Sequence, residues 1–183
     1  MLRSLIFTLI IIVSVTLSSC SVGVTNLQHY TNAIKGYEFL YPNGWMEVEV
    51  KNASEGVETV FHDLIQRSEN LSVIVSKIPE GKTLSDLGTP SEVGYRFLKQ
   101  INSDPSSDRE AELLDAEVRE SNGKTYYTLE YEVKIPNRPE RHDIASIAVS
   151  RNKLYTFNLS TDQKRWNKVN KLFKTVVNSF LVY

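Results

Sequence analysis

The sequence predicts an α+β fold in which helices cover an antiparallel β-sheet. Most segments after residue 36 have the composition or the alternation of β-strands, and two separate segments begin with helix signals. The two helices do not alternate with the strands, which favours an antiparallel sheet over a parallel one. A length of 183 residues and an apolar fraction of 41% suit one domain with a substantial core.

The expected strands follow one another with turn residues between them. Pro42-Asn43-Gly44 forms the first turn, and the run after residue 70 is rich in Val and Ile. The expected strands are residues 37–41, 45–50, 57–62 and 71–78, followed later by a hairpin of residues 143–150 and 154–160 joined through residues 151–153.

A longer hairpin is expected over residues 113–135. Asn122-Gly123 is the pair that a two-residue type I′ turn prefers, because both residues tolerate a positive φ. In the second arm apolar and polar residues alternate, which predicts one buried and one wet face. The apolar set is Tyr127, Leu129, Tyr131 and Val133, and the polar set is Thr128, Glu130, Glu132 and Lys134.

Two helices are expected. Residues 89–92, Thr-Pro-Ser-Glu, form a capping box with proline at the first helical position, where its missing N–H costs nothing. Val93, Phe97 and Ile101 then recur at helical spacing, and residues 102–108 form a polar loop. The last helix is expected to begin near residues 161–162, with one apolar face made of Trp166, Val169, Phe173, Val176, Val177 and Phe180.

The N-terminus has the pattern of an export signal. Arg3 is followed by an apolar run over residues 5–17, which at 13 residues is shorter than the roughly 20 that a membrane-spanning helix needs. The run ends in Leu-Ser-Ser-Cys, which resembles a bacterial lipobox, and Cys20 is the single cysteine of the chain. We therefore expect a signal peptide over residues 1–19, lipidation at Cys20 and a tether over residues 20–35. An uncleaved anchor and an ordinary signal with an incidental cysteine are the alternatives.

Composition excludes several functional classes. One cysteine leaves no intramolecular disulfide and no cysteine-based zinc cluster. A formal net charge of -1 and an exported chain disfavour nucleic acid as a partner. The sequence has no G-x-S-x-G, G-x-G-x-x-G, Walker or H-E-x-x-H pattern, so we expect neither an enzyme nor a small-molecule substrate.

Two histidine–aspartate pairs are candidate metal ligands. His62-Asp63 stands at a strand end and His142-Asp143 opens another strand. Imidazole and carboxylate groups bind divalent ions such as Ca²⁺, Mn²⁺ or Zn²⁺ if the two pairs meet in space. Adjacent residues of a strand point to opposite faces, so neither pair is a chelate by itself, and solvated or hydrogen-bonded side chains are the alternative.

A lysine stripe is a candidate docking surface. Lys164, Lys168, Lys171 and Lys174 fall opposite the apolar face of the last helix. The stripe suits an acidic protein surface or anionic headgroups, and the commoner alternative is the solvated side of an amphipathic helix.

Six further motifs, taken in order, cover the chain from residue 36 to near its end. They are Gly36-Tyr37-Glu38-Phe39 leading to Tyr41-Pro42-Asn43-Gly44-Trp45, Phe61-His62-Asp63, Leu84-Ser85-Asp86-Leu87-Gly88-Thr89-Pro90, Gly123-Lys124-Thr125-Tyr126-Tyr127, Lys153-Leu154-Tyr155 and Lys164-Arg165-Trp166. The series resembles the PsbP family, with the family domain over residues 36–183. The lipobox makes it similar to the cyanobacterial lipoprotein branch of that family.

The resemblance implies an αβα sandwich around a central antiparallel sheet. It also implies a protein on the lumenal side of the thylakoid membrane, held there by its lipid, with photosystem II core subunits as partners. Plant members help the oxygen-evolving centre retain calcium and chloride through a longer N-terminal segment, which this chain lacks. We therefore expect a non-enzymatic role in assembling or stabilising the oxygen-evolving complex. The alternative is a metal-binding module that supplies or retains ions there, since family members carry divalent-metal sites.

Overall fold

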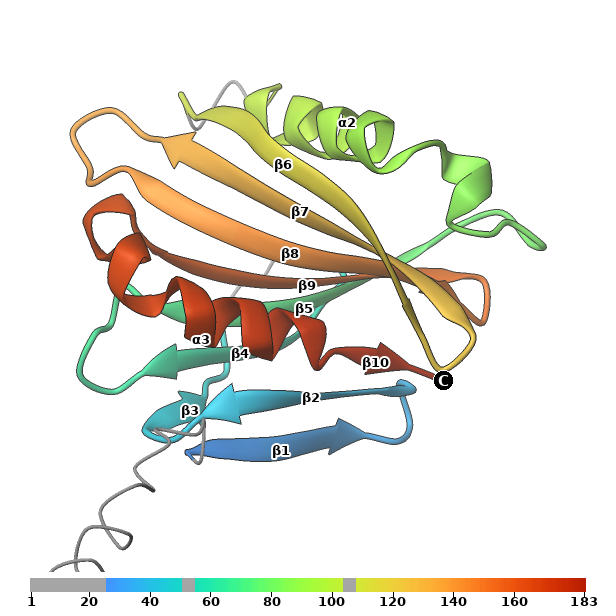
Figure 1. Cartoon of the computed structure of the whole chain (residues 1–183), viewed down its shortest axis with the longest axis horizontal. Helices are drawn as coiled ribbons and strands as arrows, with labels where there is room; N and C mark the ends of the chain where they lie inside the picture. Colours follow the sequence, from blue (N-terminus) through green and yellow to red (C-terminus); the bar gives the residue numbers. More distant parts are fainter. Residues whose placement is uncertain (1–25, 51–54, 104–107) are drawn as a thin grey trace, which may run out of the picture.

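The computed structural model describes residues 26–50, 55–103 and 108–183 (Figure 1). Cys20, the expected signal peptide and the first part of the expected tether lie outside the described residues. So do residues 104–107 of the expected polar loop.

A seven-stranded antiparallel sheet forms the centre of the fold, in the order β3-β4-β5-β9-β8-β7-β6. A second, three-stranded antiparallel sheet has the order β1-β2-β10. The strands of the large sheet are β3 Trp45–Glu47, β4 Val57–Asp63, β5 Asn70–Lys77, β6 Glu110–Ser121, β7 Lys124–Lys134, β8 Arg141–Ser150 and β9 Lys153–Asp162. Those of the small sheet are β1 Leu27–Asn32, β2 Tyr37–Pro42 and β10 Leu181–Val182.

The two α-helices lie on opposite faces of the large sheet (Figure 1). Helix α2 (Pro90–Asn102), preceded by the 3-10 turn η1 (Ser85–Leu87), covers the face over β6 and β7. Helix α3 (Trp166–Asn178), preceded by η2 (Gln163–Arg165), covers the other face together with the small sheet. The expected α+β class and layered arrangement are confirmed. No helix among the described residues has the length and apolarity needed to span a bilayer.

Each face of the large sheet has its own core. The core under α3 is aromatic: Phe157 of β9 stacks at 4.7 Å on Phe39 of β2 and at 4.9 Å on Phe180. The core under α2 is mainly aliphatic, with Val93 and Leu98 of the helix among its buried members. Among the described residues, the packed side chains of both cores come from residues 27–182, so a chain that begins at residue 20 keeps all of these side chains.

Helix α2 begins as the sequence predicts. Thr89 is the N-cap: its Oγ1 accepts from the Glu92 backbone N–H at 3.3 Å, and Glu92 Oε2 accepts from the Thr89 N–H at 2.8 Å. Gly94 lets the helix approach β6 closely, because a Cβ there would stand 3.0 Å from a methyl carbon of Leu113. The capping box and the expected helix are confirmed.

Both expected hairpins are present. Asn122 and Gly123 have φ values of 51° and 71°, as a type I′ turn requires, between the paired residues Ser121 and Lys124. The second hairpin turns tightly through Arg151 and Asn152, both also at positive φ, so Lys153 already belongs to β9. The loop expected over residues 151–153 is therefore one residue shorter.

The expected boundaries of the last helix were wrong at both ends. Residues 161–162, where we expected its start, pair with His142 and Arg141 of β8 and end β9. Helix α3 begins only at Trp166, after η2, and Phe180 lies beyond its end although its side chain is buried. Apolar spacing could not reveal this, because the pairing of β9 with β8 outcompetes helix formation until the sheet ends.

The expected tether was also wrong in part, because it contains strand β1. This strand pairs along its whole length with β2, and Tyr30 stacks on Phe39 at 5.0 Å. Its sequence, Leu-Gln-His-Tyr-Thr-Asn, lacks a clear apolar alternation, since much of the strand is exposed. The folded domain therefore begins near residue 27 rather than 36. The strand expected over residues 45–50 ends at Glu47.

Candidate functional site

His142 lies in a buried network on the α3 face of the sheet. Its ring stacks on Trp166 with 3.8 Å between centroids and an interplanar angle of 17°, and only 3% of the residue is exposed. Nε2 lies 2.9 Å from Glu130 Oε1, and Nδ1 lies 2.7 Å from Gln163 Oε1. Both ring nitrogens therefore lie within hydrogen-bond distance of side-chain oxygens of the protein.

The same network links the sheet to α3. Gln163 donates its amide N–H to Glu132, which fixes its carbonyl oxygen toward His142. Lys174 of α3 forms an ion pair with Glu130 Oε2 at 3.0 Å. The face of β7 that we expected to be wet is thus partly covered, since α3 and η2 pack over its two glutamates.

Asp143 points to the opposite face of the sheet, as adjacent strand residues must. Its carboxylate accepts from Asn158 Nδ2 at 3.0 Å, and Tyr131 donates to Asn158 Oδ1 at 2.9 Å. Burial raises the pKa of Asp143, and hydrogen bonds from Asn158 and Ser160 together with the nearby Arg141 oppose that rise.

The first histidine–aspartate pair has a different environment. His62 is half-buried on β4, in register with Asn70. Asp63 closes the turn after β4: its Oδ1 accepts from the backbone N–H groups of Ile65 at 2.6 Å and Gln66 at 2.7 Å. Asp63 is therefore occupied as a turn residue.

The structure does not bring the two pairs together. Strands β5 and β9 lie between β4 and β8. His62 and Asp143 are therefore three inter-strand spacings apart, which is about 14 Å. The described residues contain no group of three or more His, Cys, Asp or Glu side chains that could hold a metal ion.

The four lysines lie on one exposed side of the molecule. Lys164 belongs to η2 and the other three to α3, and all four are exposed. Lys174 is held by Glu130, whereas Lys168 and Lys171 form no ion pair within residues 26–50, 55–103 and 108–183. Lys164 forms none there either, so the expected basic stripe lies on the surface with three of its four lysines outside any ion pair of the described residues.

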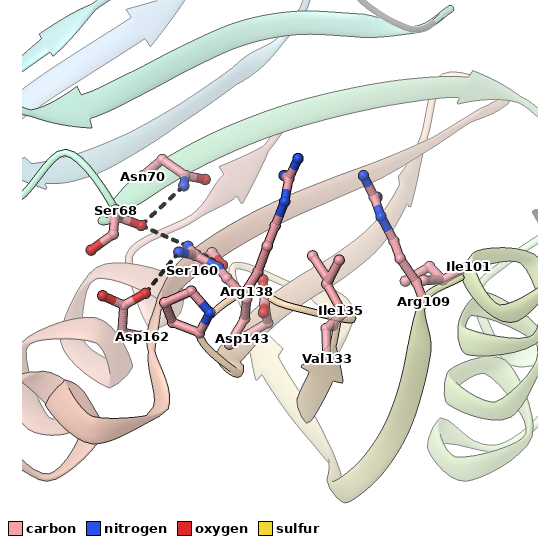
Figure 2. A pocket seen from close by; sticks show the side chains of 12 residues that line it. Ser68, Asn70, Ile101, Arg109, Val133, Ile135, Arg138, Asp143, Ser160 and Asp162 are labelled. Atoms are coloured by element: carbon pink, nitrogen blue, oxygen red, sulfur yellow. Dashed lines mark hydrogen bonds and ion pairs between the residues drawn. The ribbon is translucent and has the colours of Figure 1, made fainter. Parts of the chain in front are cut away.

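A basic pocket lies on the other face of the sheet. It has a volume of about 610 Å³, and Figure 2 shows Arg109 and Arg138 extending in the same direction from its wall. Arg141 lies deeper and is already bound: it donates to Ser160 Oγ at 2.6 Å and to the Ser68 carbonyl at 2.6 Å, and pairs with Asp162 at 3.3 Å. Guanidinium groups bind carboxylates and phosphates well, so this pocket can receive an anionic group.

Sequence reasoning did not identify this pocket. Arg109 precedes β6, Arg138 lies in the β7–β8 loop and Arg141 begins β8, so no spacing along the chain connects them. The glutamates of the His142 network were visible in the alternation of β7. The antiparallel register of β7 and β8 places them beside His142, and side chains of α3 and η2 then bind them.

The chain matches the PsbP family model over residues 25–182. It is 55% identical to the protein named CyanoP of Synechocystis sp. over 174 residues, covering 94% of this chain and 93% of that protein. It is 43% identical to the CyanoP of Thermosynechococcus vestitus over 187 aligned positions, covering both chains fully. The solution structure of cyanobacterial PsbP (CyanoP) from Synechocystis sp. superimposes with a TM-score of 0.76 at 56% identity, covering 92% of this chain and 99% of that one.

Proposed function

Because the chain belongs to the PsbP family, we propose that it is a lipid-anchored accessory protein of photosystem II on the lumenal side of the thylakoid membrane. It assists the assembly or stabilisation of the oxygen-evolving complex and does so without enzymatic chemistry. The observation that carries this proposal is the similarity to the two CyanoP proteins over nearly the whole chain.

The arrangement of charge supports a docking role. The chain has a formal net charge of -1, yet four lysines gather on η2 and α3. Such a surface attracts acidic partner surfaces and lowers the affinity for basic ones, with a strength that falls as salt rises. We propose that the α3 lysine surface, defined as Lys164, Lys168, Lys171 and Lys174, docks on acidic lumenal parts of the core subunits.

The anchor is the second part of the proposal. Leu-Ser-Ser-Cys after an apolar run supports lipidation at Cys20. Two or three acyl chains hold a domain of this size firmly to a bilayer, because each buried methylene contributes about 0.8 kcal/mol. Intact-mass analysis of the chain extracted from membranes tests this part: an unmodified Cys20, or residues 1–19 still attached, contradicts it.

Affinity purification tests the accessory role. A C-terminally tagged full chain is isolated from solubilised membranes, with Cys20→Ser as the matched control, and the proteins that accompany it are identified by mass spectrometry. Photosystem II core subunits enriched above the control support the proposal. Enrichment of assembly intermediates over mature complexes favours the assembly role, and an eluate without photosystem II proteins contradicts the accessory role.

The alternative role, a module that supplies or retains divalent ions, has no comparable support. His62, Asp63, His142 and Asp143 are the side chains proposed for it. Within the described residues the two pairs lie apart, and Asp63, His142 and Asp143 bind other protein groups. It stays a prediction that calorimetric titration with Ca²⁺, Mn²⁺ and Zn²⁺ tests. Saturable binding that His142→Gln abolishes supports it, and the lack of saturable binding excludes it.

A further inference from the structure

The turn between β4 and β5 presents two large aliphatic side chains to solvent. Leu64 is 55% exposed and Ile65 is 86% exposed, and they are followed by Gln66 and the exposed Arg67. We call residues 64–67 the β4–β5 tip. Adjacent exposed aliphatic side chains contribute nothing to the core. Such apolar surface marks a site of contact with a protein or a membrane.

The tip is held rigidly in this orientation. Asp63 Oδ1 accepts from the Ile65 and Gln66 N–H groups, and the Glu69 N–H donates to the Gln66 carbonyl at 2.7 Å. The Asp63 N–H donates to the Glu69 carbonyl at 3.0 Å and closes the base of the turn. Four hydrogen bonds thus hold the turn in a conformation in which Leu64 and Ile65 point outward.

The tip lies beside the place where the N-terminal segment leaves the fold. The Leu64 N–H donates to the Gly44 carbonyl at 3.0 Å, and the neighbouring Asn43 N–H donates to the Asn26 carbonyl at 2.8 Å. The path from Leu64 to Asn26 thus crosses two hydrogen-bonded pairs and the peptide bond between Asn43 and Gly44. The Cα atoms of Leu64 and Asn26 are therefore at most about 15 Å apart. Figure 1 shows the β4–β5 turn and the start of β1 at the same end of the molecule.

The anchor limits how far this end can stand from the membrane. Six residue steps connect Cys20 to Asn26, which span at most about 22 Å even when fully extended. If Cys20 carries the lipid, the end of the molecule that bears the tip is the end that faces the bilayer. The tip contains no acidic side chain, and Arg67 adds a positive charge that suits lipid phosphates.

We propose that the β4–β5 tip is a membrane-contact element, in which Leu64 and Ile65 insert at the lipid–water interface beside the anchor and Arg67 meets the headgroups. Two aliphatic side chains bind a bilayer weakly by themselves, and the anchor raises their effective concentration at the surface. The contact fixes the orientation of the domain, so that the same faces of the sheet always meet proteins of the membrane. This inference rests on the anchor at Cys20 that the proposed function includes.

An anchor attached by chemical coupling tests the membrane contact of the tip separately from the proposed lipidation of Cys20 in the cell. Since Cys20 is the single cysteine, its thiol couples residues 20–183 to maleimide lipids in vesicles of neutral and anionic phospholipids that also contain brominated acyl chains. Bromine quenches tryptophan fluorescence on contact. The test variant is Ile65→Trp, and the matched control is Val118→Trp, an aliphatic residue of β6 that is 60% exposed. Val118 is far from the tip. It lies five strands across the sheet and five residues along it from His62, which stands just before the tip, so roughly 30 Å separate the two Cα atoms.

We expect quenching of the Ile65→Trp variant to exceed that of the Val118→Trp variant at least about twofold, because the acyl boundary is reached only at the tip. The wild-type chain provides the baseline, since Trp45 and Trp166 are both buried. Quenching that is equal at the two positions, or no greater than in the wild type, overturns the proposal and assigns the tip to a protein partner. Because the anchor is attached chemically, such a result does not bear on lipidation at Cys20 in the cell.

Discussion

At the scale of single residues, the buried polar side chains carry the most information. His142 is 3% exposed and combines an aromatic stack with hydrogen bonds to two elements. A buried group of this kind stabilises a fold only when all its partners are present, because each orphaned partner keeps its desolvation cost. We therefore interpret His142 as the residue that fastens α3 and η2 to the sheet.

Replacing His142 by alanine tests this interpretation. The change removes the stack on Trp166 and the ring nitrogens that face Glu130 Oε1 and Gln163 Oε1. We expect the free energy of unfolding to fall by about 2–3 kcal/mol, measured by urea denaturation. Lys168→Ala, an exposed change on the same helix, is the control and should stay within about 0.5 kcal/mol. A loss for His142→Ala as small as that of the control contradicts a fastening role.

Asp143 gives a pH dependence of defined sign. Burial raises its pKa, so the folded chain holds this proton more tightly than the unfolded chain. The resulting stabilisation is complete below the unfolded pKa and is lost as the pH rises through the folded pKa. Asp143→Asn removes the titration and keeps an oxygen that can accept from Asn158.

The stability of Asp143→Asn relative to wild type should therefore increase as the pH rises, and then level off. Urea denaturation of both chains between about pH 4 and pH 8 measures this difference. Glu110→Gln, at an exposed position of β6, controls for the loss of one negative charge. Parallel curves for Asp143→Asn and wild type throughout this range would show that the pKa is not raised.

At the scale of elements, α2 is specified locally and α3 is specified by its neighbours. The capping box of α2 satisfies two backbone N–H groups through Thr89 and Glu92, and proline occupies the next position. Helix α3 has no side-chain cap, and its start is set by the end of β9 and by the packing of Trp166. The N-terminus of α2 should therefore respond strongly to a change of its cap residue.

Thr89→Ala should lower the free energy of unfolding by about 1 kcal/mol, the usual effect of losing an N-cap side chain. Ser91→Ala, at an exposed position of the same turn, is the control and should change stability by less than half of that. Hydrogen bonds from the backbone and hydroxyl of Thr89 lower the pKa of Glu92, so the cap contributes stability above the unfolded pKa and loses it as the pH falls through the folded pKa. A Thr89→Ala chain with unchanged stability would show that the cap contributes nothing.

At the scale of the whole molecule, two basic surfaces lie on different sides of one sheet. The α3 lysine surface stands on one face and the arginine pocket opens on the other. Because the two surfaces face opposite ways, a flat surface of one partner protein contacts only one of them. The proposed function assigns the partner to the α3 side.

Charge reversal on the two surfaces distinguishes them. Lys168→Glu with Lys171→Glu should reduce recovery of photosystem II core subunits with the tagged chain at least about tenfold, since like charges across an interface cost more than the roughly 1.4 kcal/mol that a tenfold loss of affinity requires. Arg109→Glu with Arg138→Glu changes the net charge by the same amount and is the matched control. If both variants lose the core subunits equally, the change in net charge is the cause. If the lysine variant recovers as much of the core subunits as the wild type, α3 is excluded from the interface.

The sequence by itself determined the fold class, the capped helix α2, the two hairpins and the family, because each depends on local signals or on motifs contiguous in the chain. Asn122-Gly123 requires only its own backbone geometry, and Thr89 and Glu92 stand one helical turn apart. The pattern around Cys20 is equally local, and it leads to the anchor as a prediction.

Only the tertiary structure decided which residues from distant parts of the chain contact one another. Strand β1 gains its place from backbone pairing with β2, which needs no apolar pattern, and the start of α3 depends on where β8 stops pairing with β9. The order of the strands places β5 and β9 between the two histidine–aspartate pairs and so keeps them apart. The same order brings Glu130 beside His142 and gathers three arginines from distant parts of the chain in one pocket. These contacts join residues far apart along the chain, so no spacing in the sequence encodes them, and the order and register of the strands had to be known first.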